Sequence, residues 1–344
     1  MKTHPQQPVP ATGQLVETCL QRFDKALASG AGQRCSPLAA VGEVLRSFQG
    51  VSARHGPRVI NDHPADLQSQ VPISAWPLWF AEAQEAERPL FYLTRSPTSA
   101  HLSMLSRQIG ERGIVFNDIE SSPSRWAKGA HPWLPLWLAG NRQCLPFDPA
   151  CGAEALAIVV GALRSLYVEG RPGFCYLTLH DQIPSVAGPY VDLHGAWLGL
   201  YRVNPPAPSA PLRLLGAGRM LDEVREAARL LAEDWGVACE LWSCPSYTRL
   251  ARDAERAGQR SHLLGCLGQG DRPVLAVTGY AQFVAAQIGA HLPGPFRALG
   301  ADSLAPGQRL DRHWVAYSAL QMLVDSGHLP VSCLAEALQC YRLN

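Results

Sequence analysis

The sequence has little lysine and no long apolar stretch. Only three of its 344 residues are Lys, and Lys and Arg together number 30 against 29 acidic residues, for a formal net charge of +1. Because the charges balance, we expect binding neither to nucleic acid nor to an anionic membrane. No apolar run approaches the roughly 18 residues of a transmembrane helix, and residues 1–10 lack the apolar core of a signal peptide.

The ten Cys residues include no C-x-x-C pair, and none has the clustered His partners of a zinc site. Several of them lie inside apolar segments, as Cys175 and Cys239 do. Free thiols that pack as small buried hydrophobes are typical of proteins in a reducing compartment. We therefore expect a cytoplasmic protein without a metal site.

Proline marks the main break in the chain. Four Pro fall within residues 203–211, which excludes a helix there and favours an extended connector. The Pro- and Gln-rich residues 1–14 are typical of a loose, flexible arm. We therefore divide the rest of the chain into a first domain at 15–185, a connector at 186–211 and a second domain at 212–344.

Strand and helix patterns alternate along both domains. Apolar runs predict strands at 59–60, 90–93, 113–116, 174–179, 212–215, 237–242, 274–277 and 296–299. Helical spacing of apolar residues predicts helices at 155–167, 221–231, 246–257, 281–291, 309–325 and 331–342. This alternation predicts an α/β fold whose mostly parallel sheets are covered by helices.

Three motifs resemble those of a known enzyme family. Residues 214–228 read L-L-G-A-G-x-x-L-x-x-V-R-E-A-A, and residues 242–253 read W-S-x-x-S-Y-T-x-L-A-R-D. Earlier, residues 144–150 read C-L-P-F-D-P-A and precede a long helix and a Y-x-T-L strand. From about residue 90 to 344, this order resembles the C-terminal half of the homodimeric bacterial pyruvate dehydrogenase subunit, a thiamin-diphosphate enzyme of the transketolase-like superfamily.

The resemblance implies a fold and a mode of assembly. The first domain is expected to be a degenerate pyrimidine-binding-like domain and the second a transketolase C-terminal-like domain, both α/β with mostly parallel sheets. Domains of this family bury large apolar faces against a twin subunit. The resemblance therefore implies a homodimer, or a hetero-association with a subunit of a thiamin enzyme.

The groups that hold and activate the cofactor in this family are missing. The family binds thiamin diphosphate through a divalent metal and a G-D-G-…-N-N motif, whereas this sequence has neither Gly-Asp-Gly nor Asn-Asn. A Glu that follows Leu-Gln must also protonate the aminopyrimidine ring. Here the matching segment reads Leu67-Gln68-Ser69, so Ser69 stands at the Glu position. We expect no cofactor-binding residue and no metal ligand in the chain alone.

The family's His-rich H-E-D-G-H loop is also altered. Residues 126–131 read W-A-K-G-A-H, so only Gly129 and one His remain. His131 is a candidate substrate contact, with packing beside Pro and Trp as the alternative. His180 and Asp181 are further candidates because they follow a strand at the edge where α/β sites lie; an exposed loop pair is the alternative.

Three functions fit these observations. The chain is a catalytically degenerate relative that acts by association or regulation, or it is half of a split enzyme, or it performs unrelated chemistry in the old cleft. As half of a split 2-oxoacid dehydrogenase or acyl- or ketol-transferring enzyme, it would need a second chain that supplies the diphosphate domain, with thiamin diphosphate and Mg.

The altered loop and the missing Glu favour the degenerate relative, which we expect to be inactive by itself. Any activity would be that of a thiamin-diphosphate-dependent decarboxylating dehydrogenase or a transketolase-like enzyme. We also predict that no carboxylate projects into the pyrimidine pocket. Asp66 or Glu82 in that cleft would instead favour the split enzyme.

Overall fold

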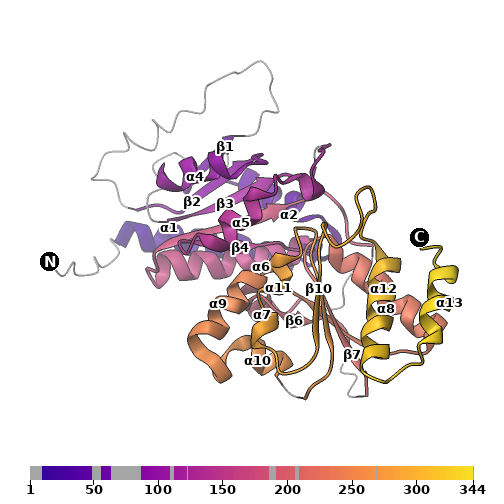
Figure 1. The fold of residues 1–344 in the computed structure, drawn as a ribbon. Helices are drawn as coiled ribbons and strands as arrows, with labels where there is room; N and C mark the ends of the chain where they lie inside the picture. The colour runs from indigo at the N-terminus through magenta and orange to yellow at the C-terminus, as the bar shows by residue number, and fades with distance from the viewer. Residues whose placement is uncertain are drawn as a thin grey trace.

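The computed structural model describes residues 10–48, 56–62, 87–108, 112–121, 123–185, 191–205, 209–268 and 270–343. Their strands form two five-stranded sheets, one in each half of the chain (Figure 1). The first contains β1 (Arg58–Asp62), β2 (Leu90–Thr94), β3 (Arg112–Asp118), β4 (Cys144–Phe147) and β5 (Gly173–Leu179). The second contains β6 (Tyr201–Arg202), β7 (Leu212–Gly216), β8 (Cys239–Ser243), β9 (Val274–Val277) and β10 (Phe296–Leu299).

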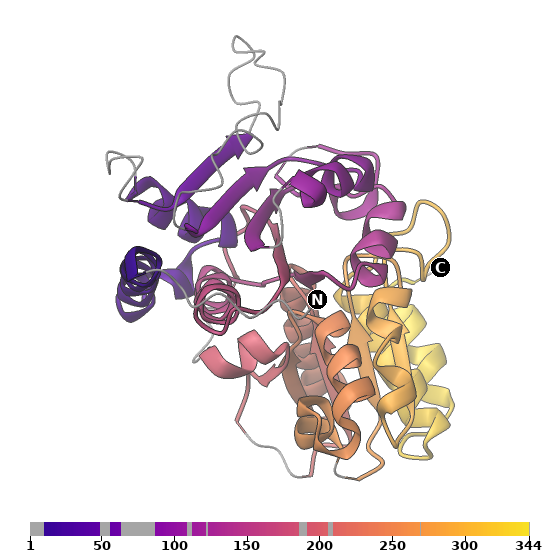
Figure 2. The same cartoon turned by 90° about the vertical axis from the view of Figure 1, so that its left-hand side faces the viewer.

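The two sheets are mostly parallel. The first has the order β1-β2-β3-β5-β4, and all its neighbouring strands are parallel. The second has the order β10-β9-β7-β8-β6, and only the short β6 runs antiparallel to its neighbour. The predicted α/β fold class is therefore confirmed. Figure 2 shows the first half, in indigo to magenta, above the second half, in orange and yellow.

Helices cover both faces of the first sheet, as its apolar strands require. One face packs against α1 (Pro10–Ala28), α2 (Pro37–Arg46) and α6 (Gly152–Leu163). The other packs against α4 (Ser99–Gln108) and α5 (Trp133–Gly140). Shorter elements complete this half of the chain: η1 (Ala31–Arg34), η2 (Ala127–Gly129), the π-turn η3 (Arg164–Val168) and α7 (Leu193–Leu198).

The second sheet is enclosed in the same way. One face contacts α8 (Met220–Trp235), α12 (Arg312–Asp325) and, at its edge, α13 (Ser332–Cys340). The other contacts α9 (Tyr247–Ala257), α10 (His262–Leu267) and α11 (Phe283–Ala286). The 3₁₀ turns η4 (Gly258–Arg260) and η5 (Gly289–His291) complete this half. No helix in the described ranges is long and apolar enough to cross a membrane.

Several helices begin at capping residues. The Ser246 side chain accepts a hydrogen bond from the N–H of Arg249 at the start of α9, and Asp311 accepts from the first turn of α12. Such caps satisfy N–H groups that have no partner within the helix. The helices predicted at 246–257 and 309–325 are therefore confirmed, with their first turns set by these caps.

Two expectations from the sequence need correction. Residues 10–14 belong to α1 rather than to an arm, because Pro is well accommodated at the first position of a helix; residues 1–9 lie outside the described ranges. The helix expected at 281–291 is limited to α11 and the separate turn η5, which begins at the poor helix former Gly289. The domain boundary within residues 186–211 stays a prediction.

Buried hydrogen bonds join the two halves. The Ser243 hydroxyl donates to Glu154 Oε1 over 2.5 Å, and Thr178 Oγ1 lies 2.6 Å from the Tyr280 hydroxyl. Arg252, on α9, donates to the carbonyls of Ala139 and Asn141 at the end of α5, over 2.8 and 3.1 Å. These contacts fix the two sheets relative to one another and thereby position the site described next.

Candidate functional site

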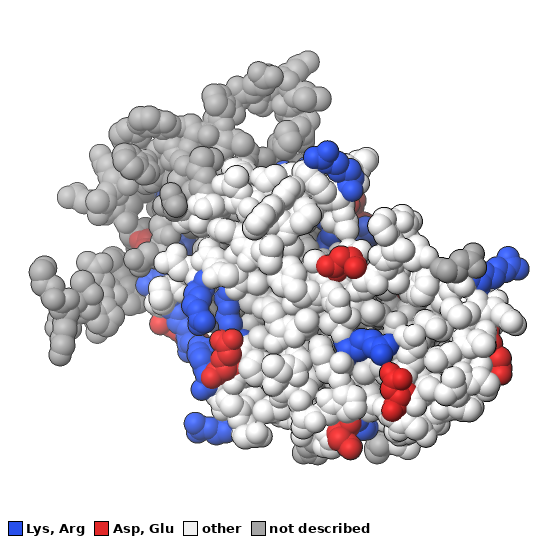
Figure 3. Space-filling model, viewed as in Figure 1, with Lys and Arg blue, Asp and Glu red and all other residues white. Residues whose placement is uncertain are grey.

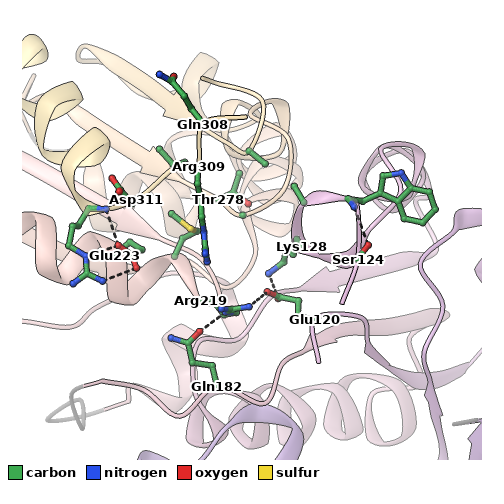
Figure 4. Close-up of a pocket in the computed structure, with 18 of the residues that line it drawn as sticks. Glu120, Ser124, Lys128, Gln182, Arg219, Glu223, Thr278, Gln308, Arg309 and Asp311 are labelled. Atoms are coloured by element: carbon green, nitrogen blue, oxygen red, sulfur yellow. Dashed lines mark hydrogen bonds and ion pairs between the residues drawn. The ribbon is translucent and has the colours of Figure 1, made fainter. Parts of the chain in front are cut away.

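A cavity of about 770 Å³ lies where the two halves of the chain meet (Figure 4). The first half contributes the loop after β3 and Gln182 after β5. The second contributes the start of α8, Thr278 and Gly279 after β9, and residues 308–312 before α12. All these segments lie at the carboxyl ends of parallel strands, where α/β proteins commonly bind their ligands.

A buried ion cluster forms one side of the cavity. The Lys128 ammonium forms ion pairs with Glu120 and with Asp148, whose Oδ1 lies 2.9 Å from Lys128 Nζ. Burial by itself would lower the pKa of Lys128, but Asp148 and Glu120 outweigh this effect and raise the pKa above its usual value. Burial raises the pKa of both carboxyl groups, against the opposing effect of Lys128.

Residues of the second half complete the cluster. Arg219 Nε donates to Gln182 Oε1 over 2.5 Å, and Arg219 Nη1 lies 3.6 Å from Glu120 Oε2. The Tyr280 ring lies 5.1 Å from Lys128 Nζ, a cation–π contact. The ion cluster of Glu120, Lys128, Asp148 and Arg219 therefore requires both halves of the chain.

The glycine turn between β7 and α8 places Asp148. Gly218 has a φ of +53°, and its N–H donates to the Asp148 carbonyl over 2.9 Å. A Cβ at this position would lie 2.3 Å from Asp148 Oδ1, so only Gly permits the close approach. The Ala217 N–H donates to the Val277 carbonyl. Because these two N–H groups are bonded within the protein, they are not available to hold a phosphate.

The loop that carries Lys128 packs tightly against the end of β3. Lys128 itself is in the left-handed region, with a φ of 56°, which is uncommon for any residue other than Gly. The next residue, Gly129, has a φ of +71°, and a Cβ there would lie 1.9 Å from the Ile119 carbonyl oxygen. The loop therefore holds the Lys128 ammonium against Glu120 by its backbone conformation.

The candidate residue His131 lies at the start of α5. Its Nδ1 accepts a hydrogen bond from the Trp133 N–H over 3.3 Å. Its ring meets the ring of Trp126 edge-on, with 5.0 Å between centroids. His131 is not among the residues that line the cavity.

The candidates His180 and Asp181 also lie outside the cavity lining. His180 is buried, with Nε2 3.2 Å from the Pro149 carbonyl oxygen. Burial, with the nearby cations Lys128 and Arg219, lowers the pKa of His180 to about 3, so the ring is neutral at physiological pH. Asp181 is exposed and accepts a hydrogen bond from the Ser36 hydroxyl. Ser69, Asp66 and Glu82 fall outside the described residues.

Sequence analysis did not identify the residues that make up the ion cluster. A usable signal was present for two of them, because Asp148 directly follows β4 and Glu120 lies two residues after β3. Charged residues at the carboxyl ends of neighbouring parallel strands meet at one edge of the sheet. Lys128 gives no such signal, because its place depends on the left-handed backbone of its loop.

The described residues do not fit thiamin diphosphate with its metal ion. They include no group of three or more His, Cys, Asp or Glu side chains that could hold a metal. The two carboxylates of the ion cluster already pair with Lys128. We therefore derive no chemical step through this cofactor.

The fold places the protein among transketolase-like α/β proteins. Residues 199–303 match the family described as the transketolase-like TK C-terminal domain. The structure is similar to transketolase from Campylobacter jejuni, with a TM-score of 0.51 and 15% identity, over 84% of this chain and 45% of that one.

Curated relatives narrow this resemblance to one enzyme component. The chain is similar to the pyruvate dehydrogenase E1 component of Cupriavidus necator, with 33% identity over 233 residues, which is 59% of this chain and 25% of the relative. The corresponding protein of Pseudomonas aeruginosa is 32% identical over 226 residues, 59% of this chain and 26% of its own length. The predicted resemblance is confirmed, and the match spans about a quarter of these relatives.

Proposed function

We propose that this protein is a catalytically degenerate relative of the pyruvate dehydrogenase E1 component and acts by associating with a second copy of itself. One observation carries the proposal. The loop at residues 126–131, which resembles the family's His- and acid-bearing loop, presents Lys128 instead, and the ammonium of Lys128 is bound to Glu120 and Asp148.

This loop offers no group suited to general acid–base catalysis. A catalytic acid or base needs access to substrate and a pKa near the working pH. The Lys128 side chain is only 2% exposed, and its pKa lies above the usual value for Lys. The ion cluster therefore supports a structural role for residues that would otherwise face a substrate.

An apolar surface on α5 supports association. Its sequence is W-L-P-L-W-L-A-G, and the side chains of Trp133 and Leu136 are 65% and 46% exposed. The face of the molecule in Figure 3 carries few charged side chains around its centre. Burying an apolar surface of this kind against another subunit is favourable, and a net charge of +1 produces little repulsion between two copies.

The association is tested by sedimentation velocity. At tens of micromolar, of order the concentrations at which moderate interfaces form, we expect a dimer. The variant Leu136→Glu should weaken it at least about tenfold, because it places a charge in the buried interface. Val331→Glu is the matched control, because Val331 is also an exposed aliphatic residue but lies beside α13.

The control variant should sediment as the unchanged protein does. A clean monomer at the same concentration, or equal weakening by both substitutions, would contradict association through α5. A monomer would leave the proposal of catalytic degeneracy standing only as a statement about the loop.

A second candidate is half of a split thiamin-diphosphate enzyme, whose partner chain supplies the diphosphate domain, the cofactor and Mg. Glu120 favours it, because this carboxylate remains at the carboxyl end of the first sheet and lines the cavity. Oxidation of a 2-oxoacid that appears only when this chain is mixed with such a partner would establish this function in place of the first.

A further inference from the structure

The cavity between the two halves contains more cationic than acidic side chains. Its lining includes the cations Arg125, Lys128, Arg219, Arg309 and Arg312 and the carboxylates Glu120, Glu223 and Asp311. Asp148, which pairs with Lys128 behind the lining, brings the carboxylates to four against five cations. A positive charge therefore remains uncompensated.

The carboxylates are already engaged. Glu223 binds the Arg312 guanidinium through two hydrogen bonds of 3.0 Å, one from Nε and one from Nη2. Asp311 caps α12 by accepting from the N–H groups of His313 and Trp314. Glu120 and Asp148 belong to the ion cluster around Lys128. None of them is positioned to neutralise Arg309.

Arg309 is the cation without a counter-charge. It is exposed, and it forms no ion pair within the part of the chain that the structure describes. Figure 4 shows its side chain extending into the cavity toward Arg219, whose Nε is bound to Gln182. Two guanidinium groups that face one cavity repel each other unless an anion lies between them.

We infer that this cavity binds a small phosphorylated anion, with its phosphate group between Arg219 and Arg309. Planar guanidinium groups bind phosphate oxygens through paired hydrogen bonds, and Gln182 and Thr278 offer neutral polar groups alongside. The volume of about 770 Å³ is that of a small-molecule site. The inference is independent of the proposed association, because it concerns a single chain.

The ligand would bridge the two halves of the chain. Gln182 follows β5 of the first sheet, whereas Arg219 and Arg309 belong to the second half. A ligand that binds only the folded arrangement stabilises it in proportion to the logarithm of its concentration. Binding should therefore appear as a rise in melting temperature without any partner chain.

The test measures thermal unfolding of the full chain with inorganic phosphate, pyrophosphate or malonate at about 10 mM, with ionic strength held constant by sodium chloride. We expect phosphate and pyrophosphate to raise the melting temperature and malonate to do so less. Arg309→Ala should weaken the apparent affinity on the order of tenfold or more, by loss of a charge-assisted contact. Arg309→Lys should give an intermediate affinity, because it keeps the charge but loses the paired geometry.

Arg142→Ala is the matched control, because the Arg142 side chain is 84% exposed and lies outside the cavity lining. It should respond to phosphate as the unchanged protein does. No shift with phosphate or pyrophosphate, an equal shift in Arg309→Ala, or a larger shift with malonate than with phosphate would each overturn the inference. Arg309 is exposed and unpaired among the described residues, so its replacement should not prevent folding.

Discussion

Replacement of Lys128 by Met should lower the free energy of unfolding by about 3–5 kcal/mol, the usual cost of removing one partner from a buried ion pair. Met fills nearly the same volume but leaves Glu120 and Asp148 buried without their shared cation. Urea denaturation at pH 7.5 would measure the loss. The deficit should shrink as the pH falls, because the unpaired carboxyl groups, whose pKa values burial already raises, then take up protons.

Two comparisons make this result specific. Arg171→Ala removes an exposed ion pair with Glu169, and it should cost less than about 1 kcal/mol. A triple variant that adds Glu120→Gln and Asp148→Asn to Lys128→Met should recover much of the loss, because no buried charge is then left unpaired. A cost below about 1 kcal/mol for Lys128→Met would mean that the ion cluster does not hold the loop.

Gly129→Ala is the second large effect, and we expect it to cost at least about 3 kcal/mol. A left-handed backbone costs a residue with a Cβ about 1–2 kcal/mol. The remainder comes from the Cβ itself, which would lie 1.9 Å from the Ile119 carbonyl oxygen. A backbone atom cannot move aside as a flexible side chain can, so the loop or the end of β3 must shift.

Gly236→Ala separates these two contributions. Gly236 has a similar φ of +65°, but a Cβ there would meet nothing within 4 Å. It should therefore cost only about 1–2 kcal/mol. Equal losses of unfolding free energy for the two variants would show that the loop around Lys128 is not tightly packed against β3.

The fold was largely predictable because both sheets are covered on both faces. The apolar run at 274–277 coincides with β9, and the run at 296–299 coincides with β10. Buried parallel strands read as continuous apolar segments and are easily seen. The short β4 was harder to recognise, because Cys144–Phe147 includes a Pro and lies at the edge of its sheet.

The site was much less predictable. His131, His180 and Asp181 follow reasonable rules for loops and strand ends, yet all three lie outside the cavity lining. The ion cluster instead joins Glu120 and Lys128 to Arg219, which is far away in the sequence. Such a pairing depends on how the two sheets meet, and no local pattern of apolar residues carries that information.

The Gly216–Gly218 turn illustrates the same limit. Its sequence alone fits either a phosphate loop or a tight turn between strand and helix. The structure decides the matter through the Asp148 carbonyl and side chain, which occupy the space next to Gly218. The partner that gives this turn its role belongs to the other half of the chain.

The central claim is that the chain cannot use thiamin diphosphate by itself. The direct measurement is calorimetric titration of the purified protein with thiamin diphosphate and Mg²⁺, read for cofactor-dependent heat. Without a diphosphate–metal site we expect no binding tighter than about 100 μM, which corresponds to roughly 5.5 kcal/mol of binding free energy. Saturable binding with a dissociation constant below about 1 μM would contradict the account and establish a complete cofactor site in this chain.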